Sequence, residues 1–240
     1  YADAIYESAD EEKNIDVAVR YNHYWDDIEY AVSLFHGTSR EASLGAYPPD
    51  DVNISKIQPY YSVISQLGIE FQYLNEGWAW KFEGIYRDGM PKAFALLQGS
   101  PVYATPSGVT IGDQKSYFAT AAGFEYTQVG IFESRVDLGW VAEHLYDSRQ
   151  DKASPSAFEH DLLLATRWAA NDGADSTLLA GVLYDYEYQG YSLSFEGSTR
   201  LFDGLSLSAE ARVFAPNEKE AQYNTIKDED FIKLTFSYYL

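Results

Sequence analysis

The chain of 240 residues contains no cysteine, so disulfide bonds and thiolate chemistry are excluded. It is also poor in basic residues, with 17 Lys and Arg against 37 Asp and Glu and a formal net charge of −20 at pH 7. Because nucleic-acid binding requires a basic surface, we expect no nucleic-acid partner. The sequence has no long apolar run, so it predicts no membrane-spanning helix.

The sequence is instead rich in tyrosine and in stretches where apolar and polar residues alternate. The chain is 46% hydrophobic and 16% aromatic, with 21 Tyr, which is too apolar for a disordered chain. Tyrosine has an apolar ring and a polar tip, so it suits a boundary between oil and water.

Strict alternation of apolar and polar residues predicts strands with one apolar face. The stretch 205–214, LSLSAEARVF, places Leu205, Leu207 and Val213 on one face and Glu210 and Arg212 on the other. Eleven segments have this pattern: 16–23, 27–34, 66–73, 78–87, 118–126, 136–143, 161–168, 177–187, 191–200, 205–214 and 232–240.

The connections between these segments also alternate. Short turns are expected at 25–26, 75–77, 129–134, 171–175 and 202–204, where Asn, Asp and Gly allow tight hairpins. Longer polar connections are expected at 39–56, 88–114, 148–156 and 215–228, with a short exception at 189–190. Short periplasmic turns and longer extracellular loops are typical of a transmembrane antiparallel up-and-down β-barrel, so we expect an all-β chain of this class.

Eleven is an unusual number, because bacterial single-chain barrels have even numbers of strands. We therefore expect about 12 strands and interpret residues 1–8 (YADAIYES) as the stump of a twelfth strand. Residues 1–240 would then form a single barrel domain, and part of the natural protein would precede Tyr1.

A water-soluble sandwich also has one apolar face per strand, so alternation alone does not decide between lipid and a protein core. The predicted segments run about eight to eleven residues, close to the nine to eleven of tilted membrane-spanning strands, whereas soluble strands average five or six. Tyr and Trp gather toward strand ends, as in an interfacial girdle. The polar face mixes charges with small residues such as Gly123 and Gly181, which suits a crowded lumen. Together these features favour the membrane barrel.

The last strand, FIKLTFSYYL, carries Phe236, Tyr238 and Leu240 on its apolar face. It resembles the C-terminal assembly signal of outer-membrane proteins, although Leu240 stands where a terminal Phe is usual. The whole chain resembles a group of porin-like proteobacterial outer-membrane β-barrel proteins, on the stretches YNHYWDDIEYAVSLFHGTSRE, GWAWKFEGIYRDG, DLGWVAEHLYDSR and LLAGVLYDYEYQGYSLSFEGSTRLFDG. The resemblance implies a location in the bacterial outer membrane, with its lipid and lipopolysaccharide and the barrel-assembly machinery as partners.

The charged residues of the polar faces are the candidate site, as the lining of a barrel lumen. They are Lys81, Glu83, Arg87, Glu143, Arg167, Asp185, Glu187, Glu196, Arg200, Glu210, Arg212 and Lys233. Such charges fit a narrow aqueous pore that passes small solutes passively and favours cations, because acids outnumber bases on this face. They fit equally a salt-bridged plug in a closed barrel, which would act as a scaffold or as the outer-membrane partner protein of an export or lipid-transfer system.

A hydrolase at the barrel rim is the third alternative. His23, His36 and His144 fall on the apolar face, but the spacing His-x-Ser is absent because Thr38 follows His36. His144 and Asp147 could stand near one rim, without further support from the sequence. We therefore predict no enzyme activity. The acidic stretches 50–53 and 227–231 lack the ligand spacing of a calcium loop, so no metal or cofactor is predicted.

Overall fold

The computed structural model describes residues 2–47, 56–91, 102–105, 108–111, 114–149, 159–217 and 227–239. Within them the chain is all-β, with two short 3-10 helices, η1 (Glu11–Lys13) and η2 (Ile131–Glu133). The long strands are β2 (Val17–Trp25), β3 (Ile28–Thr38), β6 (Val63–Asn75), β7 (Trp78–Pro91), β10 (Gln114–Gln128), β11 (Asp137–Asp147), β12 (His160–Ala169), β13 (Thr177–Asp185), β14 (Tyr191–Phe202), β15 (Leu205–Ala215) and β16 (Phe231–Tyr238).

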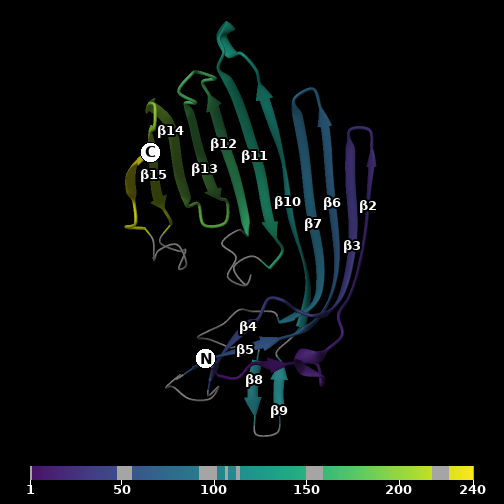
Figure 1. The fold of residues 1–240 in the computed structure, drawn as a ribbon. Helices are drawn as coiled ribbons and strands as arrows, with labels where there is room; N and C mark the ends of the chain where they lie inside the picture. The colour runs from purple at the N-terminus through teal and green to yellow at the C-terminus, as the bar shows by residue number, and fades with distance from the viewer. Residues whose placement is uncertain are drawn as a thin grey trace.

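These eleven strands form one curved sheet in the order β16-β15-β14-β13-β12-β11-β10-β7-β6-β3-β2 (Figure 1). Every neighbouring pair is antiparallel and follows the order of the long strands along the chain. All eleven predicted strands are therefore confirmed, and the sheet has the expected up-and-down connectivity. Strands β2 and β16 are its two margins and do not pair with each other.

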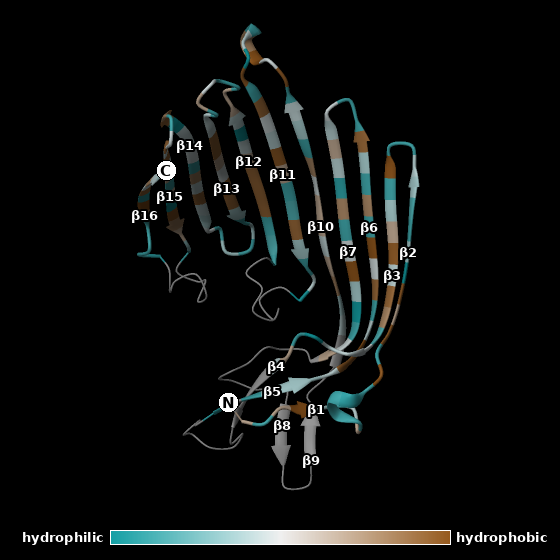
Figure 2. Cartoon of the chain, in the orientation of Figure 1, coloured by the Kyte–Doolittle hydropathy of each residue, from teal (hydrophilic) through white to brown (hydrophobic). Residues whose placement is uncertain are grey.

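The register brings the predicted apolar positions together on one side of the sheet. Across five strands, one row runs Val19, Leu34, Leu67, Tyr86 and Phe118. We call this side the apolar face and the other side the polar face. Figure 2 shows the corresponding alternation of hydropathy along β3, β7 and β11.

The apolar face of this sheet is exposed, whereas the apolar face of a sheet in a water-soluble protein is buried. Large side chains of the apolar face are exposed, among them Leu34 (56%), Trp80 (46%) and Phe195 (44%). The buried hydrophobic residues of the described chain are few, and the cluster of Ile64, Met90 and Tyr117 lies near one end of the sheet. The described residues supply no second layer over the apolar face.

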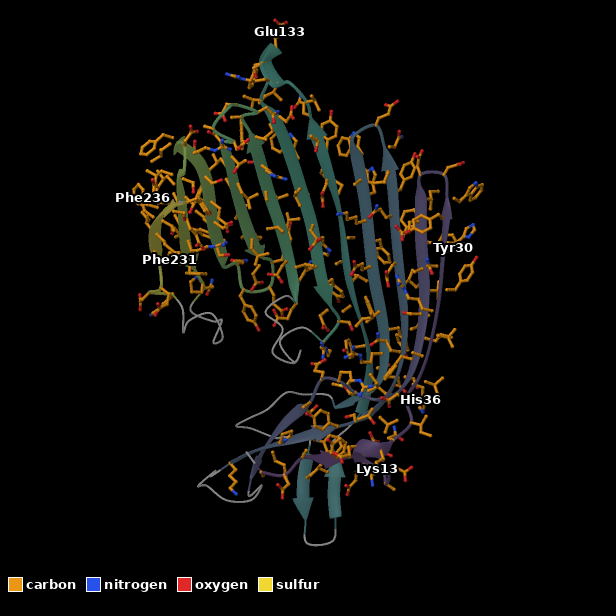
Figure 3. The ribbon with its side chains drawn as sticks, in the orientation of Figure 1. Lys13, Tyr30, His36, Glu133, Phe231 and Phe236 are labelled. Atoms are coloured by element: carbon orange, nitrogen blue, oxygen red, sulfur yellow. The ribbon has the colours of Figure 1, made fainter. Side chains whose placement is uncertain are left out.

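The two ends of the sheet differ as predicted. One end, the turn end, carries tight connections such as Asp26, whose φ of 49° suits Asp in a hairpin turn. At Gly204 φ is 78°, and a Cβ there would lie 2.8 Å from the carbonyl oxygen of Tyr239. The other end, the loop end, carries the longer connections. Figure 3 places Glu133 at the tip of the turn end and Lys13 near the loop end.

The prediction of a twelfth strand at residues 1–8 is wrong. Ile5 and Tyr6 form β1 (Ile5–Tyr6), which pairs in parallel with β5 (Lys56–Tyr61) in a separate three-stranded sheet. The Tyr6 ring stacks on Tyr61 with centroids 5.0 Å apart, and the Glu7 amide donates to the Tyr61 carbonyl. These contacts hold the segment below the loop end instead of at the margin of the large sheet.

Two predicted long loops also contain regular structure. The connection after β3 holds β4 (Ser43–Tyr47), which pairs with β5. Beyond β7, strands β8 (Val102–Thr105) and β9 (Gly108–Ile111) form a hairpin. The small sheet and this hairpin lie beyond the loop end of β2 to β10 (Figure 1).

Candidate functional site: the polar face of the sheet

The predicted charged residues share the polar face, with one exception. Lys81, Glu83, Arg87, Glu143, Arg167, Asp185, Glu196, Arg200, Glu210, Arg212 and Lys233 occupy polar-face positions in the register. Glu187 lies in the connection beyond the end of β13, because that strand stops at Asp185 where its backbone turns. Its predicted place on a strand is wrong.

The strands near the β16 margin carry a paired charge cluster. Glu196 and Glu210 are directly opposite each other on β14 and β15. The Arg212 guanidinium forms ion pairs with both carboxylates, and Lys233 Nζ lies 3.9 Å from Glu210 Oε2. Like charges that face each other across two strands destabilise a sheet, so Arg212 offsets this repulsion.

A polar hollow of about 330 Å³ lies beside this cluster. Its charged lining comes from Arg167 on β12, Glu196, Glu210 and Lys233. Ser198, Ser208 and Thr235 add hydroxyl groups. The hollow is the part of the polar face where charges, hydroxyls and open space come together.

A second set of charges spans the opposite half of the sheet. Arg20 on β2 reaches across β3 to Glu70 on β6, with 2.7 Å between Nη2 and Oε2. Ser33 and Gly68 lie in the same cross-strand row as Arg20, and their small size leaves room for this side chain. Lys81 pairs with Glu125 on the next strand at 2.5 Å.

Arg87 and Arg149 form ion pairs at the loop end of the sheet. Arg87 donates to Gln66 and pairs with Glu41 at 3.0 Å, and its side chain is only 16% exposed. Arg149 forms a two-pronged pair with Asp147 and stacks over the Tyr117 ring at 3.8 Å. Glu41 comes from the connection after β3, so these contacts tie that connection to the sheet.

Four predicted residues form no ion pair within the described residues: Glu83, Glu143, Arg167 and Asp185. Glu83 lies opposite Glu70, whose carboxylate is already held by Arg20. The uncompensated charge on this part of the polar face is therefore negative.

Buried carboxylates at the loop end were missed as a cluster by the sequence analysis. Asp161 on β12 lies directly opposite Asp185 on β13, and Glu159 immediately precedes β12. Burial raises the pKa of Glu159 to about 7, and the neighbouring carboxylates of Asp161, Asp185 and Glu187 add to this rise. The signal in the sequence is an Asp at the loop-side end of each of two consecutive strands.

Aromatic side chains mark both ends of the apolar face. All five tryptophans lie no more than three residues from the turn-side end of their strands: Trp25, Trp78, Trp80, Trp140 and Trp168. Trp78 stacks on Tyr126 with centroids 4.3 Å apart. The loop end carries tyrosine and histidine instead, and His160 contacts Tyr146 and Tyr186 with centroids 5.6 and 5.1 Å apart.

A histidine–serine contact was also missed. His36 Nδ1 lies 3.0 Å from the hydroxyl of Ser65, its partner across β3 and β6. A hollow of about 430 Å³ on the apolar face contains both side chains, together with Asp88, Leu34 and Tyr86. Thr38, and not a serine, stands two residues after His36, and the contact with Ser65 depends on a register that links positions far apart in the chain. Figure 3 places His36 near the loop end of β3.

The other residues singled out from the sequence have simpler surroundings. His23 stacks on Tyr21 at 6.2 Å, and His144 contacts the ring of His160 at 5.2 Å. Phe236 and Tyr238 are 64% and 65% exposed on the marginal strand β16. Leu240 lies outside the described residues.

No protein-family model, curated protein or solved structure matches the chain. The resemblance to outer-membrane proteins therefore stays an expectation. Across the residues that the structure describes, no helix is long and apolar enough to cross a membrane. The same residues contain no group of three or more His, Cys, Asp or Glu arranged to hold a metal ion.

Proposed function

We propose that the protein is a porin-like β-barrel of the bacterial outer membrane that lets small solutes, preferentially cations, pass along its polar face. The observation that carries the proposal is the continuous, exposed apolar face of the sheet, which contains no Asp, Glu, Lys or Arg in its predicted strand segments. The predicted lumen charges other than Glu187 lie on the other face, where a barrel would enclose them.

The energetics of the apolar face favour lipid as its surroundings. Exposed apolar surface costs roughly 25 cal/mol per Å² in water, and an apolar patch that spans a whole sheet is a strong aggregation hazard. Hydrocarbon removes this cost without a second protein layer. The unpaired backbone of a sheet margin is equally unfavourable in lipid, so the proposal also requires closure of the sheet.

The aromatic residues support a membrane orientation. On β7, Trp80 and Tyr86 are six residues apart, and on β12 Trp168 and His160 are eight apart. At about 3.3 Å per residue these separations are roughly 20–26 Å along the strand, comparable to the apolar band of outer-membrane barrels before any tilt. The tight turns would then face the periplasm and the longer connections the outside.

Closure sets a definite topological requirement. Strands β2 and β16 both run from the loop end to the turn end, so direct pairing between them would be parallel. One further strand between the two margins would restore an all-antiparallel barrel with an even number of strands. This supports the expectation of about 12 strands. Among the described residues, no strand lies between the margins β2 and β16.

The ion pairs on the polar face indicate how large a conductance to expect. Seven of the predicted lumen residues form ion pairs within the described residues: Lys81, Arg87, Glu196, Arg200, Glu210, Arg212 and Lys233. Paired charges narrow a lumen of about 12 strands, which is intermediate between a filled small barrel and an open porin. We therefore expect a small, cation-favouring conductance.

Single-channel recording in a planar bilayer tests the proposal. The folded protein should give stable steps whose reversal potential in a salt gradient shows a preference for cations. Glu196→Gln combined with Glu210→Gln should weaken this preference severalfold, and Glu133→Gln at the tip of the turn end is the matched control. Anion selectivity would contradict the proposal. Silence from folded, inserted protein would leave the alternative of a closed barrel that serves as a scaffold or as a partner in export or lipid transfer.

Ester hydrolysis is a second candidate function, favoured by the His36–Ser65 contact. His36 would accept the Ser65 hydroxyl proton as Ser65 attacks an ester carbonyl, and would return that proton to the departing alcohol before water hydrolyses the acyl-serine. The apolar hollow beside the pair suits an acyl chain. Hydrolysis of a long-chain ester in mixed micelles should be lost in Ser65→Ala and kept in Thr120→Ala, another hydroxyl of the apolar face. Equal rates in both variants would exclude this function.

A further inference from the structure

Two aspartates come together where β12 and β13 reach the loop end. Asp161 lies directly opposite Asp185 in the register of the two strands. Asp161 is only 2% exposed and Asp185 only 7%. Both positions are on the polar face, so the two side chains point to the same side of the sheet.

The hydrogen bonds of this pair leave one carboxylate oxygen without a partner. Asp185 Oδ1 accepts from the amides of Glu187 and Tyr188 at 2.7 and 2.9 Å. Asp185 Oδ2 is buried and has no hydrogen-bond partner in the structure. Asp161 Oδ2 accepts from the His160 amide at 3.2 Å.

No positive side chain of the described residues balances the pair. Among the described residues, no lysine or arginine forms an ion pair with Asp161 or Asp185. The nearby Glu159 is also buried, at 6% exposure, which increases the negative charge of the region. A buried carboxylate that lacks a counter-charge is costly, so the pair must gain a cation or a proton.

A small cavity adjoins the two carboxylates. It has a volume of about 20 Å³. Asp161, Asp185 and Ser192 contribute polar groups to its lining, and its other side is apolar, with Leu183, Phe214, Ala215 and Pro216. This is room for about one ion or water molecule. The unpartnered carboxylate oxygen and a cavity of this size are independent signs of a missing small ligand.

We propose that Asp161 and Asp185 together bind one hard divalent cation, for which Ca²⁺ is the test ion. Carboxylate oxygens are the preferred protein ligands of Ca²⁺ and Mg²⁺, which both accept backbone carbonyls and water at their remaining positions. No third carboxylate is arranged as a ligand within the described residues, so water and carbonyl or hydroxyl oxygens complete the shell. The ion joins β12 to β13 at their loop end, and this assignment is independent of the membrane proposal.

Calorimetric titration of the full-length folded protein with Ca²⁺, after removal of bound metal with EDTA, tests the site. We expect one ion per chain, together with a rise in the thermal unfolding temperature. Asp161→Asn and Asp185→Asn should each weaken Ca²⁺ binding by at least about tenfold. Replacing a residue that only supports a metal ligand already costs about tenfold in affinity, so loss of a ligand should cost no less. Asp203→Asn, an exposed acid at the turn end, should leave the affinity unchanged. A parallel titration with Mg²⁺ separates the two ions.

The stability of the variants provides a second measurement. Without metal, Asp161→Asn removes repulsion between two buried carboxylates and should raise the unfolding temperature, while Ca²⁺ should no longer change it. A wild-type protein whose unfolding temperature and calorimetric trace do not respond to Ca²⁺ or Mg²⁺ would overturn the proposal in favour of a shared proton. Equal Ca²⁺ affinity in wild type and Asp161→Asn would overturn it in favour of diffuse binding to surface acids.

Discussion

The apolar face of the sheet is exposed, whereas two carboxylates at the loop end of its polar face are buried. On the apolar face Leu234 and Phe236 are 61% and 64% exposed, although both are hydrophobic. On the polar face Asp161 and Asp185 are 2% and 7% exposed, although both carry a carboxylate. A water-soluble sheet would show the reverse, because hydrophobic residues gather inside and charges outside. The difference between the faces supports the proposal that lipid, and not water, surrounds the apolar face of this sheet.

Arginine placed on either face should separate the two environments most strongly. Leu234 and Thr235 are consecutive, exposed residues in the middle of β16 and point to opposite faces. Leu234→Arg should lower the free energy of unfolding in a bilayer by roughly 2–4 kcal/mol, because the charge enters hydrocarbon. Thr235→Arg should be tolerated, since it points to the polar face. Urea unfolding of both variants folded into lipid vesicles measures the difference.

The outcome distinguishes lipid from water around β16. If both substitutions change stability by the same small amount, the apolar face is in water and the membrane proposal fails. If Thr235→Arg is the more harmful of the two, the assignment of the faces is reversed.

Loss of Arg212 should have a smaller effect, confined to the polar face. Arg212→Gln leaves Glu196 and Glu210 opposite each other without their shared counter-charge. The residues are partly exposed, so we expect a loss of about 0.5–1 kcal/mol in the free energy of unfolding. The cation preference of any conductance should rise, because one base leaves a lumen rich in acids.

Arg20→Gln is the comparison for Arg212→Gln, since Arg20 pairs with Glu70 in the other half of the sheet. It tests whether the effect on selectivity belongs to the charges near β16 or to the polar face as a whole. A fall in cation preference in Arg212→Gln would contradict the proposed role of the acids.

The sequence predicted local structure well and distant contacts poorly. Alternation identified all eleven long strands and their faces because a period of two reports directly which side of a strand a residue occupies. Asp161 and Asp185, like His36 and Ser65, are neighbours only because of the hydrogen-bonded register between their strands. The alternation within one strand does not report this register. Residues 1–8 were misplaced because a two-residue strand such as Ile5–Tyr6 is too short to show an alternation. Strands β4, β5, β8 and β9 were not predicted either, because each is too short for a clear alternation.

The smallest expected effect, a spectroscopic one, concerns the ends of the apolar face. Because all five tryptophans lie close to the turn end, their fluorescence should report a single depth. Lipids that carry bromine near the headgroup should quench this fluorescence more than lipids with bromine at the end of the acyl chain, as expected for an interfacial belt.

A protein that keeps only Trp140 should behave in the same way. In a tryptophan-free background Leu164→Trp, in the middle of β12 and 44% exposed on the apolar face, should show the opposite order of quenching. If the two single-tryptophan proteins are quenched alike, the turn end is not at a membrane interface, and the aromatic residues there only stabilise packing between strands.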